Sequence, residues 1–152
     1  MSTHVEQSIT VDVPVETAYN QWTQFEDFPL FMEDVETVEQ IDDSTLHWKT
    51  RIRGVEREWN AEITEQTPNQ RVAWHSEDGP DHAGVVTFHK LDDATTKVML
   101  QMEFEPSGFA EKYADAVGLV EKRTMNDLEG FKKFIETRGQ ETGAWRGNID
   151  AS

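Results

Sequence analysis

The spacing of hydrophobic residues changes its period three times along the chain. Residues 5–13 alternate between apolar and polar, which predicts a half-buried strand that ends before Pro14. Apolar residues at helical spacing then predict a helix over residues 15–22. A second short helix is expected over residues 25–32, limited to one or two turns by Pro29. The chain therefore begins with one strand and two short helices.

From residue 35 to residue 104 the spacing returns to a period of two and predicts six further strands. Short connections with turn-forming residues, such as Gly54 and Pro68-Asn69, separate these strands, which is typical of an antiparallel meander. The predicted strands cover residues 35–41, 44–53, 55–65, 71–77, 83–90 and 95–104.

The same alternation predicts which side chains share a face of the sheet. One face is polar, with a basic outward row in residues 47–53 and a mostly acidic one in residues 56–62. These rows are adjacent in a hairpin, so we expect charge pairs between them, each contributing about 0.2–1 kcal/mol. The opposite face is apolar and rich in aromatic residues.

A long helical pattern follows at residues 109–137. Gly118 within it is expected to mark a bend or a close approach, because glycine costs about 1 kcal/mol relative to alanine in a helix. An apolar sheet face and an apolar helix stripe bury each other when the sheet curves around the helix. The sequence therefore predicts an α+β fold in which a seven-stranded curved antiparallel sheet wraps around a long C-terminal helix.

The length of 152 residues fits a single domain. We assign this domain to residues 1–139. Residues 140–152 are polar and glycine-rich apart from Trp145, and we expect a mobile C-terminal tail there. The alternative is that the tail docks onto the domain or onto a partner, and a buried Trp145 would favour docking.

The composition excludes several classes of function. The chain has no cysteine, and its 14 basic and 30 acidic residues give a net charge of −16. Such a charge repels phosphate backbones, so we expect no nucleic acid partner. No apolar run approaches the roughly 18 residues of a transmembrane segment, and the N-terminus lacks the pattern of a signal peptide. We therefore expect a cytoplasmic monomer or homodimer, and the acidity is also compatible with salt adaptation.

Residue spacing gives no indication of a metal, a cofactor or a catalytic set. His75, His82 and His89 are seven residues apart, which is not a spacing of metal ligands on one strand or helix. The acidic pairs Asp42-Asp43 and Asp92-Asp93 are typical turn residues. We expect no metal and no cofactor, and the catalytic residues, if any, stay unknown.

Six stretches of the chain together form a familiar pattern, and they are residues 9–22, 25–32, 35–38, 59–63, 71–74 and 84–88. They resemble the START-like (SRPBCC) superfamily, in particular its polyketide cyclase/dehydrase and ubiquinone-binding-like branch. The resemblance covers residues 3–137 and implies the helix-grip fold, with two short helices after the first strand. It also implies a cavity between the sheet and the C-terminal helix that holds an apolar ligand.

The aromatic residues of the apolar sheet face are candidates to line this cavity, or else to fill the core. Arg57 is the charged exception in its inward row, so it is a candidate to orient a carboxylate or carbonyl of a ligand. The alternative for Arg57 is a place near a strand end, in reach of solvent. The expected ligand-binding residues are Phe28, Phe31, Trp48, Arg57, Trp59, Trp74, Phe88, Leu100, Met102, Val117 and Met125.

Three functions fit these observations. The first is a carrier or sensor that binds a small hydrophobic molecule, such as a polyketide, a quinone or a lipid. The second is a polyketide aromatase/cyclase, in which Arg57, Tyr19 or Tyr113 and an indole N–H would act on a poly-β-ketone. The third is a regulator of chaperone type whose acidic field attracts a basic partner protein. We expect ligand binding to be the function, with the cyclase as the second candidate.

Overall fold

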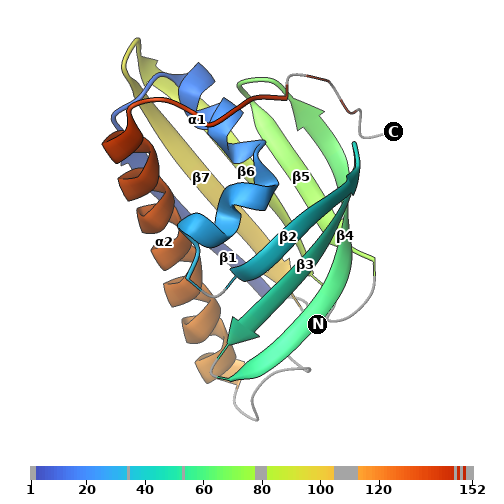
Figure 1. Cartoon of the computed structure of the whole chain (residues 1–152). Helices are drawn as coiled ribbons and strands as arrows, with labels where there is room; N and C mark the ends of the chain where they lie inside the picture. Colours follow the sequence, from blue (N-terminus) through green and yellow to red (C-terminus); the bar gives the residue numbers. More distant parts are fainter. Residues whose placement is uncertain are drawn as a thin grey trace.

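The computed structural model describes residues 3–33, 35–52, 54–77, 82–104, 113–145, 147 and 149. One strand, one helix and one short 3-10 helix precede six strands and a long helix (Figure 1). The helices are α1 (Val15–Trp22), the 3-10 helix η1 (Phe25–Leu30) and α2 (Tyr113–Arg138). The strands are β1 (Thr3–Val11), β2 (Val35–Asp42), β3 (Thr45–Ile52), β4 (Val55–Thr67), β5 (Arg71–Ser76), β6 (His82–Asp92) and β7 (Thr95–Phe104).

Within the described residues, the strands form one antiparallel sheet in the order β1-β7-β6-β5-β4-β3-β2. The predicted meander from β2 to β7 is confirmed. The pattern did not predict that β1 would pair with β7, where Val5 lies opposite Met102 and Ile9 opposite Val98. This pairing makes β1 and β2 the two edges of the sheet, so α1 and η1 must cross the concave face to connect them (Figure 1).

The sheet curves around α2, which lies beside β1, while α1 packs over β6 and β7 (Figure 1). The predicted α+β helix-grip fold is therefore confirmed. Residues 109–112 of the predicted long helix lie outside the described residues. The core forms where the inward rows of the strands meet side chains from the helices, including Tyr19 on α1 and Leu128, Phe131 and Ile135 on α2, which are all fully buried.

The segment after η1 packs closely against α2. The ring of Phe31 lies 5.6 Å from that of Phe131 and 5.1 Å from that of Phe134, measured between centroids. The backbone reaches this position because Gly130 has no side chain, and a Cβ there would collide with the carbonyl oxygen of Phe31. The close approach expected at Gly118 is thus found at Gly130. A Cβ at Gly118 would meet no described atom within 4 Å.

The described residues after α2 lie against α1 and β4. The backbone N–H of Thr142 donates to Gln21 Oε1 at 2.9 Å, and the N–H of Trp145 donates to Thr23 Oγ1 at 3.1 Å. Farther along, Gln66 and Ile149 exchange two backbone hydrogen bonds of 2.8 Å. These contacts join the segment to the domain, while its mobility stays a prediction.

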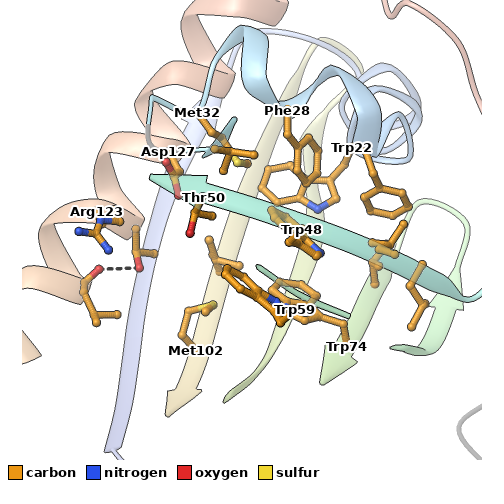
Figure 2. Close-up of a pocket in the computed structure, with 18 of the residues that line it drawn as sticks. Trp22, Phe28, Met32, Trp48, Thr50, Trp59, Trp74, Met102, Arg123 and Asp127 are labelled. Carbon is orange, nitrogen blue, oxygen red and sulfur yellow. Dashed lines mark hydrogen bonds between the residues drawn. The ribbon is translucent and has the colours of Figure 1, made fainter. Parts of the chain in front are cut away.

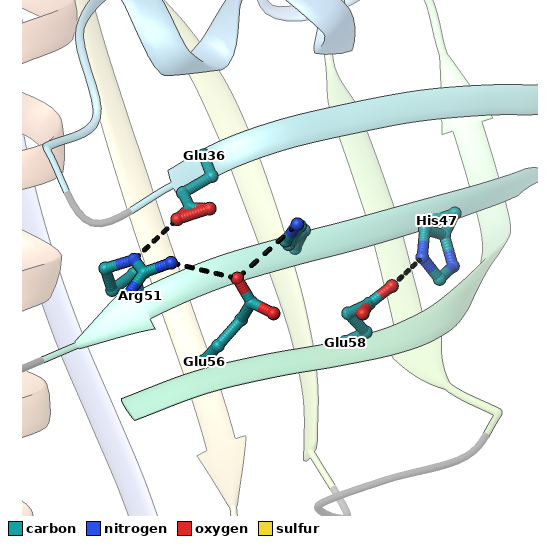
Figure 3. A network of polar contacts seen from close by, with 6 residues as sticks. Glu36, His47, Arg51, Glu56 and Glu58 are labelled. Carbon is teal, nitrogen blue, oxygen red and sulfur yellow. Dashed lines mark hydrogen bonds and ion pairs between the residues drawn. The ribbon is translucent and has the colours of Figure 1, made fainter. Parts of the chain in front are cut away.

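The convex face of the sheet carries the predicted charge pairs between β3 and β4 (Figure 3). Arg51 lies between Glu56, at 3.1 Å, and Glu36 of β2, at 2.7 Å. On the same face, His47 Nδ1 lies 2.7 Å from Asn60 Oδ1, and its Nε2 lies 3.0 Å from Glu58 Oε1. Both neighbours are hydrogen-bond acceptors, and they raise the pKa of His47 because only the protonated ring donates from both nitrogens.

The two glycines within α2 should respond to alanine in opposite ways. Gly130→Ala should lower the free energy of unfolding by about 1–3 kcal/mol, because the new methyl group meets the backbone at Phe31. Gly118→Ala should raise it by about 0.5–1 kcal/mol, because position 118 is exposed and alanine favours the helix. Urea denaturation of both variants measures the two changes, and changes of the same sign would contradict this account of the helix.

The protonation of His47 should make stability depend on pH. Since the pKa of His47 is higher in the folded than in the unfolded chain, its contribution is complete below the ordinary histidine pKa of about 6.5. That contribution should be lost as the pH rises through the raised pKa. An NMR titration of the His47 ring should give a midpoint above the midpoint in Glu58→Gln, which replaces the charged carboxylate acceptor with a neutral amide. Equal midpoints would show that Glu58 does not stabilise the imidazolium.

Candidate functional site

A cavity of about 220 Å³ lies between the concave face of the sheet and α2. Strands β3, β4, β5 and β7 form its floor, and α1, η1 and the segment that follows cover it (Figure 2). The curvature of the sheet opens this space, because one straight helix cannot contact every inward side chain of a concave surface. Such concave and mostly apolar spaces are where proteins hold small ligands.

Indole rings dominate the floor of the cavity. Trp48 of β3 and Trp59 of β4 are directly opposite in the strand register, and their rings are parallel within 3° at 6.1 Å between centroids. The ring of Phe28 on η1 lies 5.6 Å from that of Trp48 and covers it from the other side (Figure 2). Aromatic rings in contact hold one another rigidly, so the cavity offers a preformed flat surface.

Trp74 extends this floor onto β5, and its position depends on a glycine. Gly84 of β6 is its partner in the register, and a Cβ at Gly84 would press into the indole ring of Trp74. The same Cβ would lie 3.0 Å from the sulfur of Met102 on β7. The bare backbone at Gly84 therefore gives the ring of Trp74 room to lie over the sheet.

The cavity also has a polar end, formed by β3, β4 and α2. Thr50 and Arg57 are opposite in the strand register, and Arg123 and Asp127 reach the same end from α2. Figure 2 shows Thr50 beside the α2 residues and next to Trp48 on its strand. Here the floor changes from aromatic rings to groups that form hydrogen bonds.

Two buried polar atoms, the indole nitrogen Nε1 of Trp48 in the aromatic floor and the hydroxyl oxygen of Thr50 at the polar end, have no hydrogen-bond partner among the described residues. The hydroxyl of Thr124, by contrast, donates to the carbonyl of Val120 at 2.7 Å. A buried polar group without a partner destabilises the fold by about 1–3 kcal/mol, so these two atoms are available to a ligand.

Most of the expected ligand-binding residues line the cavity. The structure places there Phe28, Trp48, Arg57, Trp59, Trp74, Leu100 and Met102. Ligand binding by these residues stays a prediction.

Three expected residues pack elsewhere in the core. Phe88 is buried with its ring 5.5 Å from that of Tyr19, Phe31 packs on α2, and Met125 packs against the core. None of the three is part of the cavity wall. The side chain of Val117 lies outside the described residues.

Several residues that line the cavity were not among the expected ligand-binding residues. Thr50 belongs to the inward row of its strand, so alternation could have found it. Arg123 and Asp127 flank the apolar stripe of α2 four residues apart, which places them on one helix face. Nothing in the periodicity shows that this face meets Thr50, because that contact depends on how the sheet curves.

The described residues include no cluster of metal ligands and no membrane-spanning helix. Over the described ranges, no group of three or more His, Asp or Glu side chains could hold a metal ion. None of the described helices is long and apolar enough to cross a membrane. The cytoplasmic location and the oligomeric state stay predictions.

Comparison with known proteins assigns the chain to a family. Residues 11–133 match the family described as polyketide cyclase/dehydrase and lipid transport, so the chain belongs to that family. An uncharacterized 17.2 kDa protein in the melC2-rnhH intergenic region of Streptomyces lincolnensis is 60% identical over 146 residues. That match covers 95% of this chain and 97% of the relative.

Solved structures of low sequence identity share the fold. The Zhui aromatase/cyclase from Streptomyces sp. R1128 superimposes with a TM-score of 0.78 at 17% identity, over 95% of this chain and all of that one (100%). A START superfamily protein from Mycobacterium smegmatis gives a TM-score of 0.70 at 15% identity, over 89% of this chain and 95% of that one. At these identities the likeness extends to the fold alone.

Proposed function

We propose that this protein binds a small, flat, hydrophobic molecule in the cavity and acts as its carrier or sensor. The observation that carries the proposal is the floor of parallel and neighbouring indole rings formed by Trp48, Trp59 and Trp74. Flat rings offer a large contact area, and each square ångström of apolar surface removed from water contributes about 25 cal/mol. Membership of a family described by polyketide chemistry and lipid transport supports the same conclusion.

The size of the cavity limits the ligand. Its volume of about 220 Å³ lies below the roughly 300–1,000 Å³ of pockets that hold drug-sized molecules. A body of two fused rings, or a short chain of similar volume, is the size we propose. Phe28 and Met32 cover this space, so a ligand would be enclosed between the indole floor and η1 with the segment that follows (Figure 2).

Removal of one indole should weaken binding of a neutral bicyclic probe, 2-acetonaphthone. Trp74→Ala should raise the dissociation constant at least about tenfold, because the probe loses a flat contact surface. Isothermal titration calorimetry measures this at a temperature at which circular dichroism shows each variant folded. Trp145→Ala is the matched control, since Trp145 is not part of the cavity wall, and its affinity should equal that of the wild type. Lack of wild-type binding both to this probe and to its carboxylate counterpart, 2-naphthoate, would overturn the proposed function.

A polyketide cyclase is the second candidate, favoured by the acid and the two arginines at the polar end of the cavity. In this case the carboxylate of Asp127 would take a proton from the carbon between two ketone groups. Arg57 or Arg123 would stabilise the enolate oxygen, and the enolate carbon would attack another ketone carbon of the same chain. That attack would close the ring, and the new alkoxide would be protonated to a hydroxyl. Loss of this hydroxyl with a proton from the neighbouring carbon would release water and form a double bond, and enolisation of the ring ketones would make the ring aromatic.

The cyclase candidate predicts turnover of a poly-β-ketone thioester analogue that depends on Asp127. Chromatography with mass detection would follow loss of water from the analogue. Asp127→Asn should lower the rate at least about a hundredfold if its carboxylate is the base. Glu129→Gln should leave the rate unchanged, because Glu129 is on the exposed side of α2. The same rate in Asp127→Asn and in the wild type would exclude this mechanism.

A further inference from the structure

The charge of the cavity is opposite in sign to that of the chain. The chain has 14 basic and 30 acidic residues, but among the described residues the charged side chains that line the cavity are Arg57, Arg123 and one acid, Asp127. Asp127 follows Arg123 by four residues on one helix face and offsets one of the two positive charges. Arg57 lies near the start of β4 and is exposed, as the alternative for this residue had it, so the remaining positive charge lies where the polar end of the cavity meets solvent.

The arginines on the two sides of the hairpin β3–β4 differ in their partners. On the convex side, Arg51 is held between Glu36 and Glu56 at 2.7 Å and 3.1 Å. On the concave side, the guanidinium of Arg57 forms no ion pair and no hydrogen bond with another described side chain. Its partner in the strand register is Thr50, whose hydroxyl oxygen also lacks a partner among the described residues. The cavity thus holds a guanidinium available for an external anion.

The hydrogen-bonding character of this end indicates the kind of group that fits. An indole N–H and a guanidinium can only donate hydrogen bonds, and a threonine hydroxyl can donate as well as accept. Trp48 and Thr50 are two residues apart on one strand, so their side chains point to the same face, and Thr50 lies opposite Arg57 in the strand register. A carboxylate, which only accepts hydrogen bonds and carries a negative charge, is complementary to the Thr50 hydroxyl and to the guanidinium groups at this end.

We infer that the ligand is an amphipathic acid, with a flat apolar body on the indole floor and a carboxylate at Thr50, Arg57 and Arg123. This inference rests on the proposed function and specifies the class of ligand. A ligand with no charged group would use the indole floor alone and would leave the positive excess unbalanced. The acid uses both ends of the cavity.

The experiment compares two probes that share a naphthalene body. Sodium 2-naphthoate carries a carboxylate at pH 7, and 2-acetonaphthone carries a neutral ketone in the same position. Calorimetric titration should give a dissociation constant at least about tenfold lower for 2-naphthoate. Arg57→Gln should weaken 2-naphthoate binding about tenfold and change 2-acetonaphthone binding little, so most of the preference is lost. Arg57→Lys, which keeps the positive charge, should restore part of the preference.

Two further variants complete the test. Arg123→Gln should also reduce the preference for 2-naphthoate, and it provides a second reading if Arg57→Gln does not fold. Arg51→Gln removes the same charge from the convex face and should leave the preference unchanged, which separates a local contact from the overall charge of the protein. A preference lowered equally by Arg51→Gln and Arg57→Gln would overturn the inference.

The failure of the inference differs from the failure of the proposed function. Equal affinity of the wild type for both probes, or tighter binding of 2-acetonaphthone, would overturn the acid ligand and leave ligand binding in place. Absence of binding for both probes would overturn both. A preference for 2-naphthoate that is lost in Arg57→Gln and kept in Arg51→Gln would establish the acid as the class of ligand.

Discussion

The concave face of the sheet has a wider apolar surface than one helix can cover, and the rest of the structure depends on this mismatch. The helix α2 covers the side near β1, where Leu128, Phe131 and Ile135 are fully buried. The remaining inward side chains, on β3, β4 and β5, face α1 and η1 across a cavity of about 220 Å³. The cavity is therefore a consequence of how the sheet is closed, and the residues that border it determine what it can hold.

Bulky rings keep this space open, and absent side chains keep the rings in place. The parallel rings of Trp48 and Trp59 support each other across the hairpin, and Phe28 of η1 covers Trp48 from the helix layer. Gly84 leaves room for Trp74, and Gly130 lets the segment after η1 pack onto α2 as the cover. Two glycines far apart in the sequence thus set the floor and the roof, which shows why size at a few positions matters more than overall hydrophobicity.

The local pattern of apolar residues predicts the helices and strands. The strand pairing and the cavity wall that it did not predict depend on long-range packing. Alternation located every described strand to within about two residues, because the period of two directly reflects which face is buried. It could not show that β1 pairs with β7, since nothing in either strand identifies its partner. Alternation correctly predicted that Trp48 points inward, and it gave Phe88 the same direction. It could not show that only Trp48 borders the cavity, because that depends on α1, whose Tyr19 packs on Phe88.

The charged side chains on the two faces of the hairpin β3–β4 differ in how they are paired. On the convex face, Arg51 is paired with Glu36 and Glu56 and stays open to water, so this pairing contributes little to stability. On the concave face, the guanidinium of Arg57 and the hydroxyl of Thr50 have no partner among the described residues, although the chain has more than twice as many acids as bases. The fold gains nothing from leaving these groups without a partner, whereas a bound anion would supply one.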